Sequence, residues 1–351
     1  MATTTTPDLQ AKGPKLNRLG LPQSDYRGAP STLCPGCGHD AITSQIVKAC
    51  WEMGIEPTSA AKMSGIGCSS KTTAYFLGQS HGFNGVHGRM SAIATGSFMA
   101  NHKLVHIGVS GDGDTASIGF GNFLHMVRRN LPIVYIIENN GVYALTKGQI
   151  SATADMGSVN KNGSVNEMSP IDCCELAIAM GCDYVARSFS GDVNQVCSLI
   201  KGALAHRGTA VIDIVSPCMT FNNHEGSTKS LVYAKANEDP LHEIDFIPHF
   251  EDNKAAYKAG EAIPIGLPDG SRIILKKLAR NYDPYDRGAA LALLEKARRE
   301  RLLITGLLYH GTSGIPLDVQ LNLPDQPLAT LPESMIRPNA DALKALMKDY
   351  Q

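Results

Sequence analysis

Two polar motifs at a fixed separation constrain the fold of this chain most strongly. The first is Gly-Asp-Gly-Asp at 111–114, and the second is Asn-Asn at 139–140, with 24 residues between them. Each motif directly follows a strand-like apolar run, at 104–109 and at 133–137. Because ligands of open α/β sheets bind in the crevice outside the carboxyl ends of the strands, we expect both motifs to meet in one crevice.

The residue types in these motifs suit a metal ion and a diphosphate. Glycine lets the backbone approach a phosphate closely, and Asp and Asn supply the hard oxygen ligands that Mg²⁺ prefers. The two motifs together resemble the thiamine-diphosphate fingerprint. The resemblance implies that Asp112, Asn140 and the carbonyl of Val142 hold Mg²⁺, which in turn holds the cofactor's diphosphate. Gly-Asp-Gly alone would predict no more than a turn with an N-cap.

Strand-like and helical patterns alternate along the first two thirds of the chain. Apolar spacing predicts helices over 41–51, 117–130 and 192–206, and strands over 58–63, 133–138, 184–188 and 209–216. Such alternation is typical of an α/β fold with a doubly wound, mostly parallel sheet. The resemblance implies the thiamine-diphosphate-binding type of this fold, and we expect a C-terminal extension in addition.

The ends of the chain lack this alternation. We expect an N-terminal arm over 1–32, an α/β domain that binds the cofactors over 33–230, and a C-terminal extension over 231–351. The arm carries four prolines and is read as extended against a partner. The extension is expected to pack on the same domain or on a partner subunit, and its stretch 316–332 reads as a loop.

Composition excludes several classes of protein. Apolar residues make up 43% of the 351 residues and charged residues 19%, and the net charge is −1. These values are ordinary for a globular protein and argue against nucleic-acid or membrane-surface partners. No run of 18 apolar residues exists, and the first 15 residues lack the apolar core of a secretory signal. We therefore expect a cytoplasmic protein.

Four of the nine cysteines stand in loops punctuated by glycine or proline. They are Cys34, Cys37, Cys68 and Cys218. Four thiolates suit either a [4Fe–4S] cluster or a tetrahedral zinc ion, and the residues alone do not rank the two. A c-type haem would need His directly after Cys37, where Gly38 stands. A thioredoxin-like pair would leave two of the four unexplained, and buried cysteines in a plain turn remain the simplest alternative.

The motifs in combination resemble the β subunit of the 2-oxoacid:ferredoxin oxidoreductases over about residues 30–225. The matching segments are Cys-Pro-Gly-Cys-Gly-His at 34–39, Gly-Ile-Gly-Cys at 65–68, His-Gly-Arg at 87–89, Ala-Thr-Gly at 94–96, Gly-Asp-Gly-Asp at 111–114, Asn140 with Tyr143, Thr-Lys-Gly-Gln at 146–149 and Ser-Pro-Cys at 216–218. One departure is Leu33, where many relatives carry an aromatic residue.

This resemblance implies an activity and a set of cofactors. The four loop cysteines would bind one [4Fe–4S] cluster beside thiamine diphosphate and Mg²⁺. The enzyme would decarboxylate a 2-oxoacid oxidatively in a coenzyme A-dependent reaction and pass electrons to ferredoxin, or run in reverse as a carboxylase. Lys147 in Thr-Lys-Gly-Gln looks like the version that accepts 2-oxoglutarate, whereas pyruvate-preferring relatives carry a small residue. A pyruvate-preferring or broad-range enzyme is the alternative.

The resemblance also assigns roles to single residues. His39 and Lys147 would be catalytic, and Lys147 with Arg89 would bind the substrate carboxylate. His39 could instead be a helix-start residue bonded to backbone, Lys147 a solvated side chain, and Arg89 a structural ion-pair partner. The residues expected to contact the cofactor are Gly67, Ser69, His87, Gly88, Gly111, Asp112, Gly113, Asp114, Asn140, Leu145 and Thr146.

No second cofactor domain fits into the roughly 110 residues before the first motif. The active site would therefore be completed by an α subunit, in an αβ or (αβ)₂ assembly that uses ferredoxin as its electron partner. Two other functions stay open on the sequence. One is a non-oxidative thiamine-diphosphate decarboxylase or synthase subunit, and the other is a non-catalytic zinc-binding interaction protein.

Overall fold

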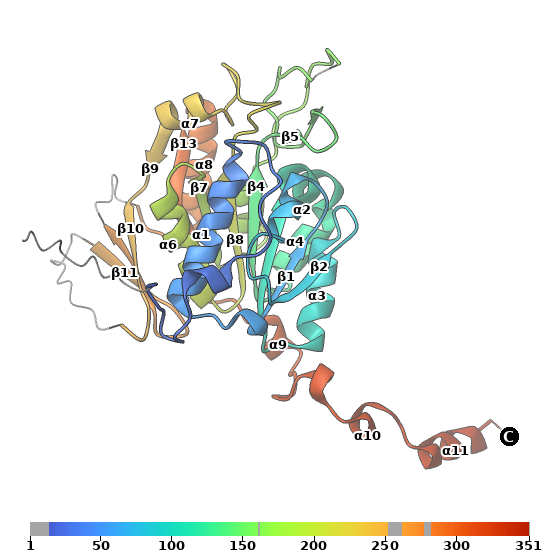
Figure 1. Ribbon diagram of the computed structural model, residues 1–351. Helices are drawn as coiled ribbons and strands as arrows, with labels where there is room; N and C mark the ends of the chain where they lie inside the picture. Colours follow the sequence, from blue (N-terminus) through green and yellow to red (C-terminus); the bar gives the residue numbers. More distant parts are fainter. Residues whose placement is uncertain (1–13, 161, 252–261, 277–281, 351) are drawn as a thin grey trace, which may run out of the picture.

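A computed structural model describes residues 14–160, 162–251, 262–276 and 282–350. Its centre is an eight-stranded sheet in the order β2-β1-β3-β4-β8-β7-β13-β9 (Figure 1). Neighbouring strands are parallel except that β13 runs antiparallel to β7. The strands are β1 Ala60–Ser64, β2 His81–Asn84, β3 Val105–Gly111, β4 Ile133–Asn139, β7 Tyr184–Phe189, β8 Thr209–Val215, β9 Glu238–Pro240 and β13 Leu303–His310.

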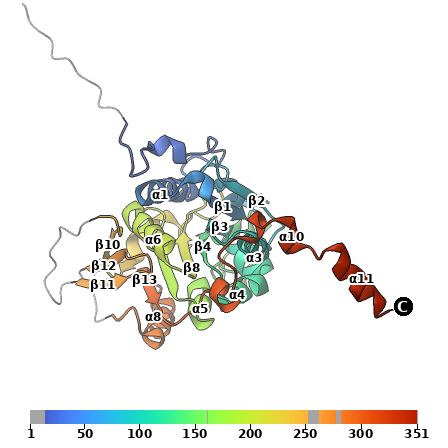
Figure 2. The same cartoon turned by 90° about the horizontal axis from the view of Figure 1, so that it is seen from below.

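Helices cover both faces of this sheet, as Figure 2 shows from below. On one face lie α1 Gly38–Met53 and α6 Val193–Ala205, and on the other lie α3 Met90–Ala100, α4 Phe120–Arg128, α5 Cys173–Ala179 and α8 Arg287–Glu300. All seven residues of β4 are buried, as expected for a parallel strand covered on both faces. The predicted doubly wound, mostly parallel α/β fold is confirmed.

One predicted helix is divided in the structure. The stretch 117–130 was expected to form a single helix, but a π-helical turn, η3 Asp114–Ile118, precedes α4. Gly119 joins the two, and a Cβ there would lie 2.5 Å from the carbonyl oxygen of Asp114. The close backbone approach therefore requires glycine and brings the chain from the first motif into α4.

The described part of the N-terminal arm packs on its own chain. It contains a short turn, η1 Gln23–Tyr26, in which Tyr26 is fully buried. Asn17 donates through Nδ2 to the Tyr26 hydroxyl at 2.7 Å and to the carbonyl of Trp51 at 3.0 Å. These contacts fix residues 17–26 against α1.

Part of the C-terminal third completes the central sheet. The apolar run that forms β13 was not predicted as a strand, although its first six residues are buried. A separate antiparallel sheet has the order β10-β12-β11, with β10 Glu243–Ile247, β11 Ala262–Gly266 and β12 Arg272–Lys276. Helix α7 Leu231–Asn237 precedes β9.

The last described residues leave the body of the molecule (Figures 1 and 2). They form the short helices α10 Glu333–Ile336 and α11 Ala340–Lys348, of which no residue is buried. The preceding helix, α9 Leu317–Gln320, still packs on the body through the buried Leu317. Within residues 14–160, 162–251, 262–276 and 282–350, no helix is long and apolar enough to cross a membrane.

Candidate active site

The predicted site residues gather at one edge of the sheet, where β1, β3, β4 and β8 end. The loops that follow these strands lie at the top of Figure 1, around the short pair β5 Val142–Tyr143 and β6 Gln149–Ile150. This edge carries both polar motifs and all four loop cysteines, because each of these segments adjoins a strand end or the start of α1.

Asp112, the first residue after β3, is held by a set of hydroxyl donors. Its Oδ2 accepts hydrogen bonds from Ser151 and from Thr153 Oγ1, the latter at 2.6 Å. Its Oδ1 lies 3.4 Å from the backbone nitrogen of Asn140. Burial raises the pKa of this carboxyl, whereas the bonds from Ser151 and Thr153 lower it. The first motif and the second therefore meet at Asp112.

Asn140 occupies a tight loop between β4 and β5. Its Oδ1 accepts from the backbone nitrogen of Val142 at 3.1 Å, and its carbonyl accepts from Asn222 Nδ2 at 2.8 Å. Gly141 between them has φ +73°, a conformation that favours glycine. The loop thus brings the backbone of Asn140 next to Asp112, and the grouping of the oxygens of Asp112, Asn140 and Val142 around a metal ion stays a prediction.

The carboxylate of Asp114 is hydrogen-bonded to other groups of the protein. Its carboxylate accepts from the backbone nitrogens of Gly88 at 2.7 Å and Ile66 at 3.1 Å, and from Ser110 Oγ at 2.7 Å. It also bonds His87 Nδ1. Asp114 therefore ties together the loops after β1 and β2, and its role in cofactor contact stays a prediction.

His87 and Arg89 lie near this carboxylate, and their side chains differ in the contacts that hold them. The His87 ring makes an edge contact with Tyr143, with centroids 5.9 Å apart, and 30% of its side chain is exposed. Arg89 donates through Nη1 to the carbonyls of Gly88 at 3.1 Å and Ile118 at 3.2 Å. These bonds give Arg89 a structural role, since they fix the turn before α3.

The cysteine segments come from the start of α1 and from the ends of β1 and β8. Cys34 and Cys37 precede α1, Cys68 begins the short helix α2 Cys68–Thr72, and Cys218 follows β8. Thr220 Oγ1 lies 3.9 Å from Cys34 Sγ, so the first and last segments touch. Burial, followed by the charge of Cys218, raises the pKa of Cys68 to about 11. All four are free thiols.

Zinc and a [4Fe–4S] cluster need different arrangements of four thiolates. A zinc ion draws its four thiolates onto one atom. A [4Fe–4S] cluster binds each cysteine to a different iron and holds the sulfurs farther apart. Among the residues that the structure describes, no three or more His, Cys, Asp and Glu side chains are arranged to hold a single metal ion. The identity of the group that the four cysteines bind stays a prediction.

A buried polar pair lies between the cysteine segments and β4. His39 Nδ1 is 2.6 Å from Ser216 Oγ, and its Nε2 is 3.7 Å from Glu138 Oε2. Burial lowers the pKa of His39 to about 4, so the ring is neutral at neutral pH. Burial also raises the pKa of Glu138. Sequence reasoning missed Glu138; the signal was an acidic residue ending an apolar run directly before the second motif.

The remaining predicted residues at this edge differ in how deeply they are buried. Leu145, Thr146 and Lys147 are exposed. Lys147 has φ +79°, its backbone nitrogen donates to the carbonyl of Ala144 at 3.1 Å, and its side chain makes no hydrogen bond or ion pair to the described residues. Gly67 caps α2 with φ +133°, and Ser69 behind it is buried. A Cβ at Gly111 would lie 3.2 Å from Ser69 Oγ. The loops after β1 and β3 are thus in close contact.

Sequence and structure comparisons identify the family. Residues 65–214 match the family described as thiamine pyrophosphate enzyme, C-terminal TPP binding domain. A 2-oxoacid:ferredoxin oxidoreductase subunit β from Saccharolobus solfataricus is 40% identical over 243 residues, which are 67% of this chain and 80% of the relative. The chain belongs to the 2-oxoacid:ferredoxin oxidoreductase β-subunit family.

Two further similar proteins are named for 2-oxoglutarate. A 2-oxoglutarate oxidoreductase subunit KorB from Mycobacterium tuberculosis is 36% identical over a segment that covers 58% of this chain and 54% of the relative's length. The 2-oxoglutarate:ferredoxin oxidoreductase from Magnetococcus marinus, solved with 2-oxoglutarate, coenzyme A and succinyl-CoA bound, has a TM-score of 0.72 and 31% identity. That match covers 92% of this chain and 95% of the solved chain.

Proposed function

We propose that this β subunit holds thiamine diphosphate, Mg²⁺ and one [4Fe–4S] cluster and catalyses coenzyme A-dependent oxidative decarboxylation of 2-oxoglutarate, with electrons passed to ferredoxin. The observation that carries the proposal is the meeting of two sites at one edge of the sheet. The Asp112–Asn140 loop lies on one side, and the cysteine segments lie on the other.

The diphosphate side fits a magnesium ion. Asp112, Asn140 and the carbonyl of Val142 offer oxygen ligands of the type that Mg²⁺ prefers. The hydroxyls of Ser151 and Thr153 orient the Asp112 carboxylate and favour its charged form. Position 113 requires glycine, because a Cβ there would lie 2.5 Å from the ring of Tyr143. Thiamine diphosphate, when bound, supplies the electron sink that decarboxylation of a 2-oxoacid requires.

The cysteine side fits an electron-transfer cluster close to that loop. Its ligands would be Cys34, Cys37, Cys68 and Cys218. Ser216 lies two residues before Cys218 and is hydrogen-bonded to His39. A cluster accepts electrons one at a time, which is the chemistry that links the decarboxylation to ferredoxin. The same residues would serve the reverse, carboxylating direction.

Individual side chains would bind and orient the substrate. His39, neutral at neutral pH, can accept a proton at one ring nitrogen or donate a hydrogen bond from the other. Lys147, exposed and without a described carboxylate partner, can pair with the distal carboxylate of 2-oxoglutarate. Arg89 is a weaker candidate for that role, because its guanidinium already bonds two carbonyls.

Membership of a β-subunit family implies an α partner. We place this partner at the edge of the sheet where β1, β3, β4 and β8 end. An αβ or (αβ)₂ assembly would complete the site. We also propose that 33–230 forms the cofactor-binding domain, with 1–32 and 231–351 as its N-terminal arm and C-terminal extension. The exposed helices α10 and α11 are the parts of that extension free to contact another subunit.

An anaerobic assay of the co-purified complex tests this function. We expect coenzyme A-dependent reduction of a low-potential acceptor in the presence of thiamine diphosphate and Mg²⁺, faster with 2-oxoglutarate than with pyruvate. A preference for pyruvate would change only the substrate assignment, to the pyruvate-preferring or broad-range alternative. Release of CO₂ without acceptor reduction would replace the proposal by a non-oxidative decarboxylase or synthase subunit.

A further inference from the structure

A row of buried polar side chains crosses the central sheet behind the proposed magnesium loop. Arg187 in β7 and Asp213 in β8 lie opposite each other in the strand register. Asn139 ends β4 and Asp112 follows β3, so the row crosses four neighbouring strands in the order β7-β8-β4-β3. Each of these four residues is 9% exposed or less. The row therefore lies in the interior, and it ends at a proposed metal ligand.

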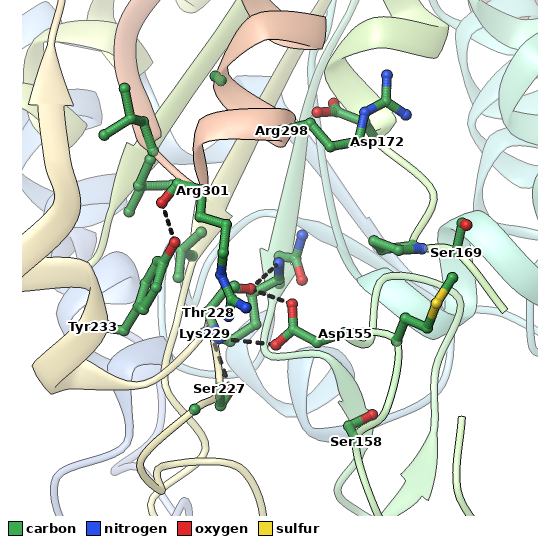
Figure 3. A pocket seen from close by; sticks show the side chains of 18 of the residues that line it. Asp155, Ser158, Ser169, Asp172, Ser227, Thr228, Lys229, Tyr233, Arg298 and Arg301 are labelled. Atoms are coloured by element: carbon green, nitrogen blue, oxygen red, sulfur yellow. Dashed lines mark hydrogen bonds between the residues drawn. The ribbon is translucent and has the colours of Figure 1, made fainter. Parts of the chain in front are cut away.

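The outer end of the row is held at the start of α5. Asp172 caps this helix, because its Oδ1 accepts from the backbone nitrogens of Cys174 at 2.9 Å and Glu175 at 3.0 Å. The same carboxylate accepts from Arg187 Nη2 at 2.5 Å. Asp172 lies in the wall of a cleft of about 730 Å³ (Figure 3). The guanidinium of Arg187 is therefore fixed to a helix cap on one side.

Hydrogen bonds lead from Arg187 inward to Asp112. Arg187 Nε lies 3.4 Å from Asp213 Oδ2, and Asp213 Oδ1 accepts from Asn139 Nδ2 at 3.0 Å. Because a carboxylate only accepts, this bond turns the amide nitrogen of Asn139 toward Asp213 and the amide oxygen toward Thr153. Thr153 Oγ1 lies 2.9 Å from that oxygen and 2.6 Å from Asp112 Oδ2. The Thr153 hydroxyl thus joins the row to the carboxylate of Asp112.

The two oxygens of Asp112 have unequal surroundings. Oδ2 accepts from the hydroxyls of Ser151 and Thr153. Oδ1 lies 3.4 Å from the Asn140 nitrogen, which is longer than the roughly 2.9–3.0 Å usual for such a bond. Groups that hold one part of a metal ligand orient the part that binds the metal. The hydroxyls therefore restrain Oδ2 and leave Oδ1 as the oxygen for a metal ion.

The ion pair within the row is a poor source of stability. Arg187 and Asp213 are the charged residues of two buried strands that are otherwise uncharged. Desolvation offsets much of the attraction in a buried ion pair, and well-packed apolar residues often stabilise a fold as well or better. Burial raises the pKa of Asp213, whereas the charge of Arg187 lowers it and favours the carboxylate. A role at the site accounts for the pair better than stability does.

We propose that Arg187, Asp213 and Asn139 are positioning residues, which act through the Thr153 hydroxyl to hold the Asp112 carboxylate in place for Mg²⁺. The inference rests on the proposed function, in which Asp112 is a metal ligand. Loss of a member of the row frees the hydroxyl and lets the carboxylate rotate, which weakens metal binding. Asp213 could also attract the metal by its charge alone. The two explanations differ in the effect of Asp213 once Thr153 has been replaced.

A double-mutant cycle tests the row by calorimetric titration of Mg²⁺ into the αβ complex, purified without air, with excess thiamine diphosphate. We expect Asp213→Asn and Thr153→Val each to weaken Mg²⁺ binding about tenfold, as loss of a group that orients a metal ligand does. In the double variant the further loss should be less than about twofold, because Asp213 acts through Thr153. Asp183→Asn is the matched control. Asp183 is also a buried acid, but it precedes β7 at the opposite edge of the sheet, where it accepts from the nitrogen of Gly314.

The outcomes separate positioning from charge and from plain stability. A loss of about 100-fold in the double variant would show independent effects and overturn the row. A lower melting temperature of the metal-free complex in Asp213→Asn, with unchanged Mg²⁺ affinity, would also overturn it. If Asp213→Asn fails to assemble, Asn139→Leu takes its place in the cycle with the same expected results. Absence of Mg²⁺ binding by the unmodified complex would refute the proposed function and the row together, whereas the other results refute the row alone.

Discussion

Two buried carboxyl groups at the ends of neighbouring strands have opposite surroundings. Asp112, after β3, bonds Ser151 and Thr153 and lies close to the Asn140 nitrogen. Glu138, in β4, has no hydrogen-bond partner for either oxygen among the described residues. Burial is the largest cause of the raised pKa in both. Only at Asp112 do donors offset it.

This difference separates the two halves of the site. The diphosphate half is organised by the chain's own hydroxyls and amides, as a pre-formed binding site requires. The cysteine half contains a buried acid at 3.7 Å from a neutral histidine and beside free thiols. An unpartnered buried polar group is unfavourable unless something else satisfies it. The burial of Glu138 is therefore unfavourable in a way that the burial of Asp112 is not.

The largest expected effect is loss of the cluster in Cys68→Ser. A lost ligand should reduce acceptor reduction by more than the roughly 10–100-fold that loss of an outer-sphere partner causes. Iron content and acceptor reduction of the anaerobically purified complex measure the effect. Cys197→Ala is the control, because Cys197 is buried in α6 away from the loop cysteines. Full iron content in Cys68→Ser would contradict the ligand assignment.

Asp112→Asn tests the pre-formed half. The substitution keeps the shape but removes the charge that binds the metal, so we expect thiamine diphosphate to bind roughly 100-fold more weakly in the presence of Mg²⁺. Titration calorimetry measures the affinity, with Asp325→Asn as a control whose side chain is 98% exposed. Equal affinity in both variants would remove Asp112 from the metal site.

Thr153→Val should have a smaller effect of the same kind. Removing the hydroxyl withdraws one donor that lowers the pKa of Asp112, so that pKa rises further in the variant. Protons then compete better with the metal, and affinity for Mg²⁺ should fall up to about tenfold, most strongly as the pH is lowered. An identical pH dependence in the variant and the wild-type complex would show that the hydroxyl does not control Asp112.

Glu138→Gln should leave cofactor affinity unchanged and alter stability. Burial raises the pKa of Glu138 in the folded state above the ordinary value of 4.5. The contribution of this carboxyl to the free energy of unfolding is therefore full below pH 4.5 and is lost as the pH rises. The amide avoids this loss. Thermal unfolding of the complex should show the variant melting higher at pH 8 by about 2–4 °C per kcal/mol gained, with the gain vanishing toward pH 4.5. A lower melting temperature at pH 8 would show that Glu138 has a partner in the assembly.

The fold was largely predictable because its strands and helices alternate with clear periodicity. The strands predicted before 111–114 and 139–140 led to the parallel topology and to the position of the Asp112–Asn140 loop. β13 escaped prediction for a physical reason, since it enters the sheet antiparallel to β7 from a segment without such alternation. The division of the expected helix at 117–130 was also missed, because it depends on the close approach of Gly119 to Asp114.

Contacts across long stretches of sequence set the rest of the site. Ser151 and Thr153 reach Asp112 over 39 and 41 positions, and no local pattern marks them as its donors. The resemblance singled out His39, but the burial of this residue and its bond to Ser216 over 177 positions were not foreseeable. Spacing predicts which chemistry is present, and tertiary packing decides which protonation state each group holds.

The most direct test of the account is the metal content and the spectrum of the complex purified without air. The account predicts a brown protein with about four irons per β chain, no stoichiometric zinc, and a visible band that bleaches on reduction with 2-oxoglutarate and coenzyme A. A colourless protein that contains zinc, or one whose iron persists when Cys68 is replaced, would contradict the claim that these four cysteines hold an electron-transfer cluster beside the Asp112 loop.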